Sequence, residues 1–288
     1  MVWVEAMPEG PEVKRLAQRL GKVLVGKPLS SVAFSYRALG IFDQELSSSE
    51  IELVDSRGKA LLIRFCCGKT IYSHNQLYGK WIVTRAGVEP KTGRTKRLVI
   101  QTSQHRAALY SASEIEVLEN SAVLDHSFLR KLGPDALSEE THWRDVAARL
   151  MEPSFKNRSL GALLLDQSFV AGLGNYLRTE ILHEACLHPD LRPKDLSRSE
   201  TGKLARSILE ITRLALKTAG VTNKPSRVKK LKRIGLTRSR YRFSAFAREG
   251  QACYRCEETI ERRSVNSRRL YLCRACQPDR LQIPRDNS

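Results

Sequence analysis

The 288-residue sequence contains no long apolar run, although apolar residues make up 41% of the chain. None of its apolar runs approaches the roughly 20 residues that a membrane-spanning helix needs. The first six residues, Met1 to Ala6, also lack the basic segment followed by a long apolar one that marks a secretory signal. We therefore expect no association with a membrane and a location in the cytoplasm.

Acidic residues are too few to balance the basic ones. The chain has 31 Asp and Glu against 49 Lys and Arg, so its formal net charge is +18. Such an excess favours a polyanionic partner, most commonly nucleic acid, over an ordinary basic surface. Residues 221–242 contain nine Lys and Arg and no acidic residue. We expect a flexible basic arm there, which lies along a phosphate backbone and makes binding strongly salt-dependent.

Cysteines occur in an odd number, seven, and together with the lack of an export signal this suggests a reducing compartment. Four of the seven form two CxxC pairs separated by 16 residues, Cys253 with Cys256 and Cys273 with Cys276. This is the spacing of a zinc ribbon, in which four thiolates hold one structural Zn²⁺ and leave no position open for substrate. The alternative is two disulfides or free thiols. Two neighbouring cysteines at 66 and 67 end an apolar run, and we expect them to pack rather than to bind metal.

The apolar patterns predict an α+β protein. Helical spacing predicts a helix from Pro11 to Leu24, which Gly26 and Pro28 follow. Short apolar or alternating runs then predict strands of an antiparallel sheet system at 32–36, 60–65, 80–84, 98–102 and 107–110. The second half is predicted to be helical at 141–150, 160–169, around 177–185 and at 199–216.

The stretch Pro8-Glu9-Gly10-Pro11-Glu12 can supply a nucleophile only if Pro8 is the first residue. A terminal proline is a secondary amine, and α-amino groups titrate near pH 7.7–8.0, so part of it is nucleophilic at neutral pH. Attack on a sugar C1′ would give an iminium, and the neighbouring Glu9 carboxyl is suited to proton transfer. We expect translation to start at Met7, followed by removal of that methionine. The alternative is that Pro8 and Pro11 only mark a turn and a helix start.

Three other stretches are candidates for function. Lys59 follows Arg57-Gly58 before a strand, where a solvated lysine is the ordinary expectation. Gln76-Leu77-Tyr78 precedes Gly79 and offers either core residues or a wedge that fills the gap left by an extruded base. Asn175 ends a glycine-containing turn, where it is a candidate helix N-cap beside a phosphate site.

Taken together, these motifs and the four-cysteine segment resemble the bacterial Fpg/Nei DNA glycosylases, and most closely their endonuclease VIII branch. The resemblance covers the chain from Met7 to about Cys276. It implies a β-sandwich with flanking helices at 7–130, a helix–two-turn–helix domain with the basic loop at 131–242 and a zinc finger at 243–280. It further implies that damaged double-stranded DNA lies between the domains and that the protein is a bacterial monomer.

The resemblance also assigns roles to residues. It implies catalysis by Pro8, Glu9 and Lys59 together with the finger-tip Arg268, and Glu12 would help to shape the pocket. DNA contacts would come from a second set of residues: Gln76, Leu77, Tyr78, Lys131 and Asn175. At Lys131 the family has an arginine, and lysine keeps the charge but loses the bidentate fork.

The function that follows is a bifunctional DNA glycosylase and AP lyase of base excision repair. It would remove an oxidised base and then break the strand by β,δ-elimination through an iminium on Pro8. Gln76-Leu77-Tyr78 points to oxidised pyrimidines. Two alternatives remain open: an enzyme for oxidised purines, and a non-catalytic zinc-finger protein that only binds DNA.

Overall fold

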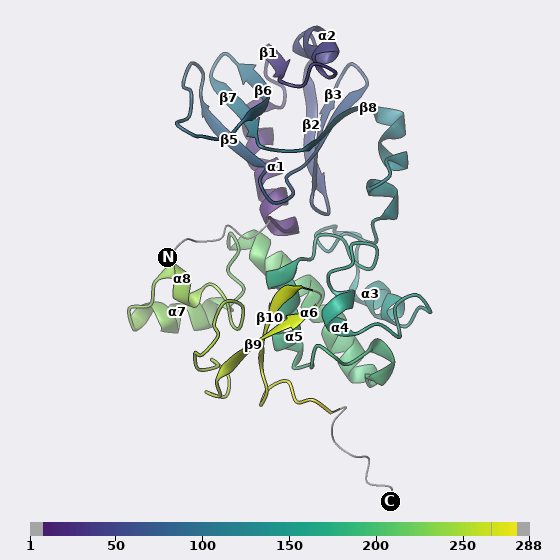
Figure 1. The fold of residues 1–288 in the computed structure, drawn as a ribbon, viewed down its shortest axis with the longest axis vertical. Coiled ribbons are helices and arrows are strands. Elements are labelled where there is room, and N and C mark those ends of the chain that lie inside the picture. Colours follow the sequence, from purple (N-terminus) through teal and green to yellow (C-terminus); the bar gives the residue numbers. More distant parts are fainter. Residues whose placement is uncertain (1–7, 266, 281–288) are drawn as a thin grey trace, which may run out of the picture. The chain divides into compact units, whose positions relative to one another are not determined.

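The computed structural model describes residues 8–265 and 267–280, and the chain divides into two compact units between Lys131 and Leu132. Figure 1 shows a first unit built mainly from strands and a second built mainly from helices. Within the described residues, no helix is long and apolar enough to cross a membrane. The predicted start at Met7 lies outside the described residues.

The first unit is a β-sandwich of two four-stranded antiparallel sheets, with strand orders β1-β6-β7-β5 and β2-β3-β4-β8. Its core includes Ile63 and Phe65 from one sheet and Ile100 and Leu109 from the other, all fully buried. The elements run as follows: α1 Gly10–Leu24, β1 Leu29–Phe34, α2 Asp43–Ser47, β2 Ile51–Arg57, β3 Ala60–Phe65, β4 Lys69–His74, β5 Lys80–Arg85, β6 Lys96–Thr102, β7 His105–Tyr110 and β8 Glu114–Glu119.

The second unit packs helices around a separate core, to which the last hairpin contributes Leu270 and Leu272. The two core helices, α5 and α6, pack against each other, and α5 also packs against β10. The elements are α3 Trp143–Leu150, α4 Leu160–Leu163, α5 Asn175–Ala185, α6 Arg198–Lys217, α7 Pro225–Arg233, α8 Arg238–Tyr241, β9 Ile260–Val265 and β10 Arg268–Cys273. The predicted α+β class, with a strand domain followed by a helical domain, is confirmed.

Several local predictions are wrong. The helix expected over 160–169 ends at Leu163 and continues as turns. Residues 221–242, expected to be a flexible arm, form α7 and α8 instead. Cys66 and Cys67 do not pack in the core, because they occupy the exposed turn between β3 and β4.

Three strands were not predicted, namely β2, β4 and β8. In β2 and β4, polar residues stand where the period-two pattern would place apolar ones, and β4 buries Thr70 and Ser73. Pairing with neighbouring strands, rather than their own hydrophobicity, fixes these two as strands. The edge strand β8, Glu-Ile-Glu-Val-Leu-Glu, begins with alternating polar and apolar residues, a strand signal that the prediction missed.

Candidate functional site

The first part of the site forms because α1 and β2 run antiparallel in the first unit. At the C-terminal end of α1, the N–H of Gly26 donates to the carbonyl of Ile51 at 3.1 Å. Nearer its N-terminus, Lys14 Nζ lies 2.5 Å from the Asp55 carboxylate. The chain after Asp55 therefore continues toward the start of α1, and the turn holding Lys59 lies at the Pro8 end of this helix (Figure 1).

The residues before α1 are held firmly. Glu9 is only 3% exposed, and Pro8 is partly buried. The N–H of Glu9 donates to the Glu12 carboxylate at 3.2 Å, while its carbonyl accepts from the N–H groups of Glu12 and Val13. Glu12 therefore fixes the peptide that follows Pro8, and its part in shaping a pocket stays a prediction.

Lys59 lies in the two-residue turn between β2 and β3, where Gly58 has a φ of 59° that favours glycine. The adjacent Ala60 pairs with His74 at the end of β4. Burial lowers the pKa of His74, and the positive charge of Lys59 lowers it further, against the opposing effect of Glu114. The charge of Lys59 is therefore close enough to the His74 imidazole to act on it.

The turn after His74 presents the three wedge candidates in different ways. Gln76, with a φ of 45°, is fixed by hydrogen bonds to Glu114 and from Ser113. By contrast, Leu77 and Tyr78 are 53% and 66% exposed at the tip. The tip thus exposes one aliphatic and one aromatic side chain next to the fixed Gln76, as a wedge requires.

Gly79 is required by the shape of this turn. Its N–H donates to the Asn75 carbonyl at 2.7 Å. A Cβ on Gly79 would lie 2.6 Å from that oxygen and 2.7 Å from the Asn75 Cα, which is too close for any other residue. The backbone at Gly79 therefore controls where the exposed tip residues lie.

A separate group of candidate residues lies in the second unit, at the start of α5. The N-cap of α5 is Gly174, so the prediction that Asn175 is the N-cap is wrong. The Asn175 side-chain amide instead donates to the carbonyl of Arg269 at 2.8 Å and accepts from Arg178 at 2.6 Å. Arg178 is completely buried and also donates to the Arg269 carbonyl at 3.2 Å. These bonds join the start of α5 to the β9–β10 hairpin.

The hairpin contains four arginines whose roles the sequence alone could not separate. Arg262 and Arg263 are ion-paired to carboxylates at 3.3 and 3.2 Å. Arg268 and Arg269 open β10 with exposed side chains. Among the described residues, neither of these two has a recorded carboxylate partner. Arg269 is a candidate that sequence reasoning did not select, and its neighbour Arg268 stays a predicted site residue.

Glu180 is a second residue that sequence reasoning missed. It is 2% exposed, and its carboxylate accepts hydrogen bonds from the N–H groups of Ser244, Ala245 and Phe246, each at 2.8 Å. The Thr222 hydroxyl also donates to it. One carboxylate in α5 thereby fixes both ends of the 222–244 segment, a contact that no local pattern indicates.

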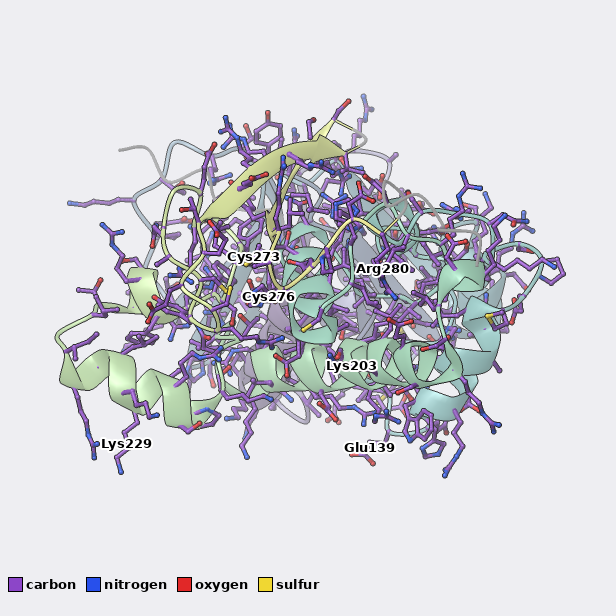
Figure 2. All side chains as sticks on the ribbon, turned by 90° about the horizontal axis from the view of Figure 1, so that it is seen from below. Glu139, Lys203, Lys229, Cys273, Cys276 and Arg280 are labelled. Atoms are coloured by element: carbon purple, nitrogen blue, oxygen red, sulfur yellow. The ribbon has the colours of Figure 1, made fainter. Side chains whose placement is uncertain are left out.

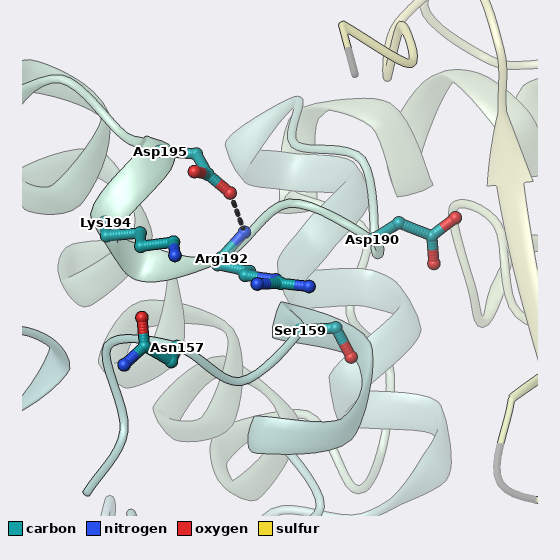
Figure 3. A pocket seen from close by; sticks show the side chains of 6 residues that line it. All are labelled: Asn157, Ser159, Asp190, Arg192, Lys194 and Asp195. Atoms are coloured by element: carbon teal, nitrogen blue, oxygen red, sulfur yellow. Dashed lines mark hydrogen bonds between the residues drawn. The ribbon is translucent and has the colours of Figure 1, made fainter. Parts of the chain in front are cut away.

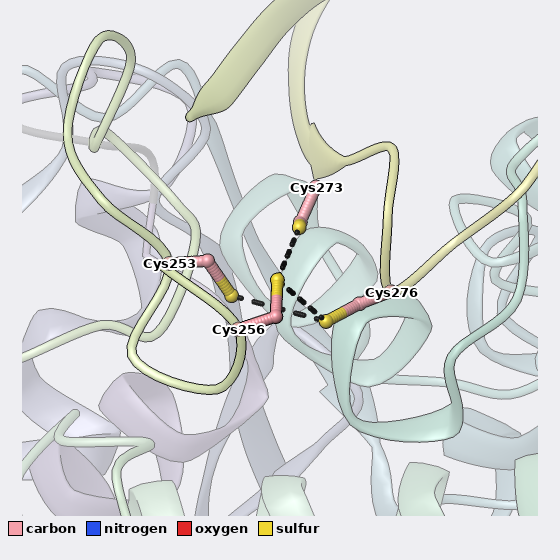
Figure 4. Close-up of side chains that lie close together, drawn as sticks. All are labelled: Cys253, Cys256, Cys273 and Cys276. Carbon is pink, nitrogen blue, oxygen red and sulfur yellow. Dashed lines mark hydrogen bonds between the residues drawn. The ribbon is translucent and has the colours of Figure 1, made fainter. Parts of the chain in front are cut away.

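The four predicted metal ligands come together, as Figure 4 shows, with all four Sγ atoms within 4.8 Å of one another. Tetrahedral zinc with about 2.3 Å bonds would hold its sulfur atoms roughly 3.8 Å apart. The observed Sγ separations include 4.0 Å for Cys253–Cys276, 3.3 Å for Cys256–Cys273 and 3.4 Å for Cys256–Cys276. The donor set and its spacing therefore fit one four-coordinate metal ion.

A buried histidine contacts one cysteine of this cluster. The buried His183 of α5 places Nε2 3.3 Å from Cys253 Sγ. Burial raises the pKa of the Cys253 thiol, but the His183 hydrogen bond and nearby N–H groups outweigh it and lower the pKa to about 7. Burial raises the pKa of Cys273 to about 11. His183 thus favours one thiolate before any metal binds.

Two further features of the second unit carry no assignment. His188, Asp190 and Asp279 approach one another closely, but the Arg263 guanidinium lies 3.2 Å from Asp190 and 3.3 Å from His188, which disfavours a second cation. A hollow of about 650 Å³ lies nearby and carries charges of both signs. Figure 3 shows its lining: Asn157, Ser159, Asp190, Arg192, Lys194 and Asp195.

Lys131 ends the short helical turn Leu129–Lys131, and its side chain is exposed, as is that of Arg130. It occupies the last position of the first unit. Both cations are thus available to a phosphate, and nothing in the first unit favours one over the other.

The chain is similar in sequence to known DNA glycosylases along most of its length. The formamidopyrimidine-DNA glycosylase N-terminal domain matches residues 7–113, and the formamidopyrimidine-DNA glycosylase H2TH domain matches 132–226. Endonuclease 8 of Enterobacter sp. (strain 638) is 43% identical over 271 residues, which cover 94% of this chain and all of that protein. Endonuclease 8 of Salmonella typhi is 42% identical over the same extent.

Solved structures share the fold. The complex of Lactococcus lactis Fpg (MutM) with DNA containing an oxidised pyrimidine superimposes with a TM-score of 0.78 at 24% identity. The match covers 94% of this chain and 100% of that one. A complex of the Lactococcus lactis protein with DNA containing an abasic site matches over the same extents with a TM-score of 0.77.

Proposed function

Since the chain belongs to the formamidopyrimidine-DNA glycosylase family and is more than 40% identical to endonuclease 8 proteins, we propose that it excises oxidised bases from DNA and cleaves the strand. It is a DNA glycosylase and AP lyase of base excision repair. Oxidised pyrimidines are its main substrates, in keeping with its endonuclease 8 relatives. The protein acts in the cytoplasm as a monomer on damaged duplex DNA.

The observation that supports this proposal is the antiparallel run of α1 and β2, which directs the turn holding Lys59 toward the end of α1 that Pro8 and Glu9 precede. With Pro8 as the first residue, its amine attacks C1′ of the flipped nucleotide, and the bond to the damaged base breaks. Glu9 and Lys59 move the protons at the sugar and at the departing base. Opening of the sugar ring leaves an iminium between Pro8 and C1′.

The iminium then drives strand cleavage. It withdraws electrons from C2′, which loses a proton as the 3′-phosphate departs in β-elimination. A second, δ-elimination releases the 5′-phosphate and leaves a gap of one nucleotide. Water hydrolyses the remaining iminium and restores the Pro8 amine. The hydrogen bond between Glu9 and Glu12 favours the attack by Pro8, because it fixes the peptide next to the attacking nitrogen.

Binding of damaged DNA requires that the damaged base is extruded, that the gap in the base stack is filled and that phosphate charges are neutralised. The exposed Leu77 and Tyr78, which follow Gln76, fill the gap that the flipped base leaves. Lys131 contacts phosphate in the first unit. In the second unit, Asn175 and Arg268 contact phosphates around the lesion, and the bonds from Asn175 to the hairpin backbone hold these two residues in a fixed relation.

The metal at the cysteine cluster is one structural Zn²⁺. Its four ligands leave no free position, so it stabilises the β9–β10 hairpin and takes no part in the reaction. Metal analysis of the purified protein should give one zinc per chain. Chelation should lower DNA affinity and remove hairpin amide signals, and retention of both without zinc would contradict this role.

Borohydride trapping on a thymine glycol duplex tests the catalytic proposal. Two forms are compared, one starting at Met7 and one retaining Met1 to Ala6, with each N-terminus verified by mass spectrometry. The form that exposes Pro8 should give a covalent protein–DNA band, and the longer form should give none. A band from the intact longer form would identify another amine as the nucleophile. Binding without a band from either form would leave only the non-catalytic alternative.

Lys59 is tested in the same assay. Lys59→Gln should slow trapping on the thymine glycol duplex by about 10²-fold, the usual contribution of a positioned acid. Trapping on a duplex with a preformed abasic site should be affected much less, since no base has to leave. The exposed Lys22 of α1 provides the matched control Lys22→Gln, which should behave as the parent protein. Comparison of thymine glycol with 8-oxoguanine duplexes separates pyrimidine from purine preference.

A further inference from the structure

The helical pair α7–α8 has an exposed face whose composition is unusual for a solvated surface. Lys229, Lys230, Arg233 and Ile234 lie at positions i, i+1, i+4 and i+5 of α7 and its C-cap, so they share one side of the helix. We call these four residues the basic face. All are exposed, Ile234 by 72%, and Figure 2 shows Lys229 pointing away from the ribbon.

The tip that carries Ile234 has a defined shape. The N–H of Gly235 donates to the Lys232 carbonyl at 3.0 Å, and the N–H of Leu236 donates to the Leu231 carbonyl at 3.1 Å. This is a Schellman ending, and Gly235 supplies the positive φ that it requires. Leu231 is buried and Leu236 partly buried, so two of the apolar side chains turn inward while Ile234 alone stays in solvent.

The base of the pair is closed and attached to α5. The N–H of Thr222 donates to the Arg242 carbonyl at 2.9 Å, and the Asn223 side chain donates to the Tyr241 carbonyl at 2.9 Å. Thr222 also donates to Glu180 of α5. The helices α7 and α8 therefore have a defined arrangement, and α5 sets their position within the second unit.

The charges of the basic face are not balanced within the segment. No acidic residue occurs between 221 and 242, and Lys229 and Arg233 are like charges one turn apart, an arrangement that destabilises a helix slightly. The helix dipole favours cations in the last turn, but it does not account for Lys229 or for an exposed isoleucine. Among the described residues, no carboxylate is recorded as a partner of these three cations.

We propose that the basic face is a second contact for duplex DNA, one that does not require a lesion. It rests on the proposed function in taking DNA as the ligand. Lys229 and Arg233 are about 6 Å apart along the helix axis, close to two nucleotide steps of about 3.4 Å along one strand. These cations bind phosphates of one strand that lie two steps apart, and Ile234 contacts the apolar sugar and base edges of the adjacent groove.

This contact would serve the search for damage. Phosphate contacts carry no sequence information and allow a protein to slide along DNA, whereas Leu77 and Tyr78 act only where a base is extruded. The basic face holds undamaged duplex while the catalytic residues of the first unit sample it. Its loss should therefore weaken binding to undamaged and damaged duplexes by the same factor.

The experiment compares full-length variants on an undamaged duplex over a range of salt concentrations. Lys229→Gln/Lys230→Gln/Arg233→Gln should reduce the slope of log Kd against log salt by about two to three, since each phosphate contributes about 0.9. The matched control neutralises three exposed cations of α6, Arg198→Gln/Lys203→Gln/Lys217→Gln, which carry the same total charge change. It should reduce the slope by less than one.

Ile234→Ser tests the apolar part of the contact. It should weaken binding several-fold at every salt concentration without changing the slope, because no charge is lost. Circular dichroism and the melting temperature of each variant should match the parent, so that a folding defect cannot account for the result.

The proposal fails if the triple variant keeps the parental slope or if the α6 control loses as much. It also fails if the basic face instead governs sedimentation with phosphatidylglycerol vesicles while the duplex slope is unchanged, which would make it a membrane contact. Trapping by the form that starts at Met7 is measured in parallel. A lack of trapping by that form, with the expected slopes, would overturn the proposed function and leave this inference standing.

Discussion

Glu180 offers the sharpest test of how the second unit is held together. In Glu180→Gln, one oxygen can still accept from Ala245 and Phe246, but the new amide group faces the N–H of Ser244. A buried N–H without an acceptor costs about 1–3 kcal/mol. The two remaining bonds lose their charge assistance, which adds about 1 kcal/mol. The Thr222 hydroxyl has a second acceptor, the Arg242 carbonyl at 3.2 Å, so its loss adds little.

The cost before any offset is about 2–4 kcal/mol, and relief from desolvating a carboxylate offsets part of it, so we expect a net loss of about 2 kcal/mol in the free energy of unfolding. For a unit of this size, each kcal/mol lowers the melting temperature by roughly 2–4 °C, so the expected shift is about 4–8 °C. Calorimetry is the suitable assay, because it can resolve the two units if they unfold separately.

Glu210→Gln is the matched control, since Glu210 is exposed on α6 in the same unit. It should leave the melting temperature of the second unit within about 1 °C of the parent value, as is usual for surface substitutions. If Glu180→Gln also melts within about 2 °C of the parent, the carboxylate does not hold the 222–244 segment, and the reasoning above is wrong.

Two other predictions follow from local geometry. Gly79→Ala should destabilise the first unit by about 1–3 kcal/mol, because its Cβ would meet the Asn75 backbone, whereas Gly93→Ala, with open space around it, should not; denaturant unfolding distinguishes them. Burial raises the pKa of Asp166, but hydrogen bonds from Ser168 and Arg158 outweigh it and lower that pKa below its ordinary value. Its stabilising effect is present above the unfolded pKa near 3.9 and is lost as the pH falls through the lower folded pKa. The stability difference between the parent and Asp166→Asn should therefore shrink between pH 7 and pH 3, and a constant difference would contradict the assignment.

Residues close in sequence carried most of what could be predicted. The first helix is fixed by apolar residues at helical spacing with a glycine after its end, so the prediction from Pro11 to Leu24 agrees with α1 almost to the residue. The two CxxC pairs likewise define a four-ligand set, because each knuckle places two thiolates within a few residues of one another. The strand at Ala60–Phe65 was predicted with its observed bounds for the same reason.

Predictions failed where distant residues decide the local structure. The strand β4 has Lys69, Thr70 and Ser73 among its six residues, and its pairing with β3 and β8 makes it a strand. The segment 221–242 has the charge of a disordered arm, yet buried Leu231 and the closure of its ends give it helical order. Charge composition measures how strongly a segment interacts with water, but not whether another part of the chain will bury its few apolar residues.

The sequence by itself determined which chemical groups this protein has: a proline and a glutamate before the first helix, four cysteines in two CxxC pairs and a large positive charge. Tertiary structure alone decided how those groups meet. Antiparallel packing of α1 on β2 brings Lys59 to the Pro8 end, and Asn175 reaches the carbonyl of Arg269, 94 residues away. Such contacts depend on packing between elements far apart in the chain, which no local periodicity records.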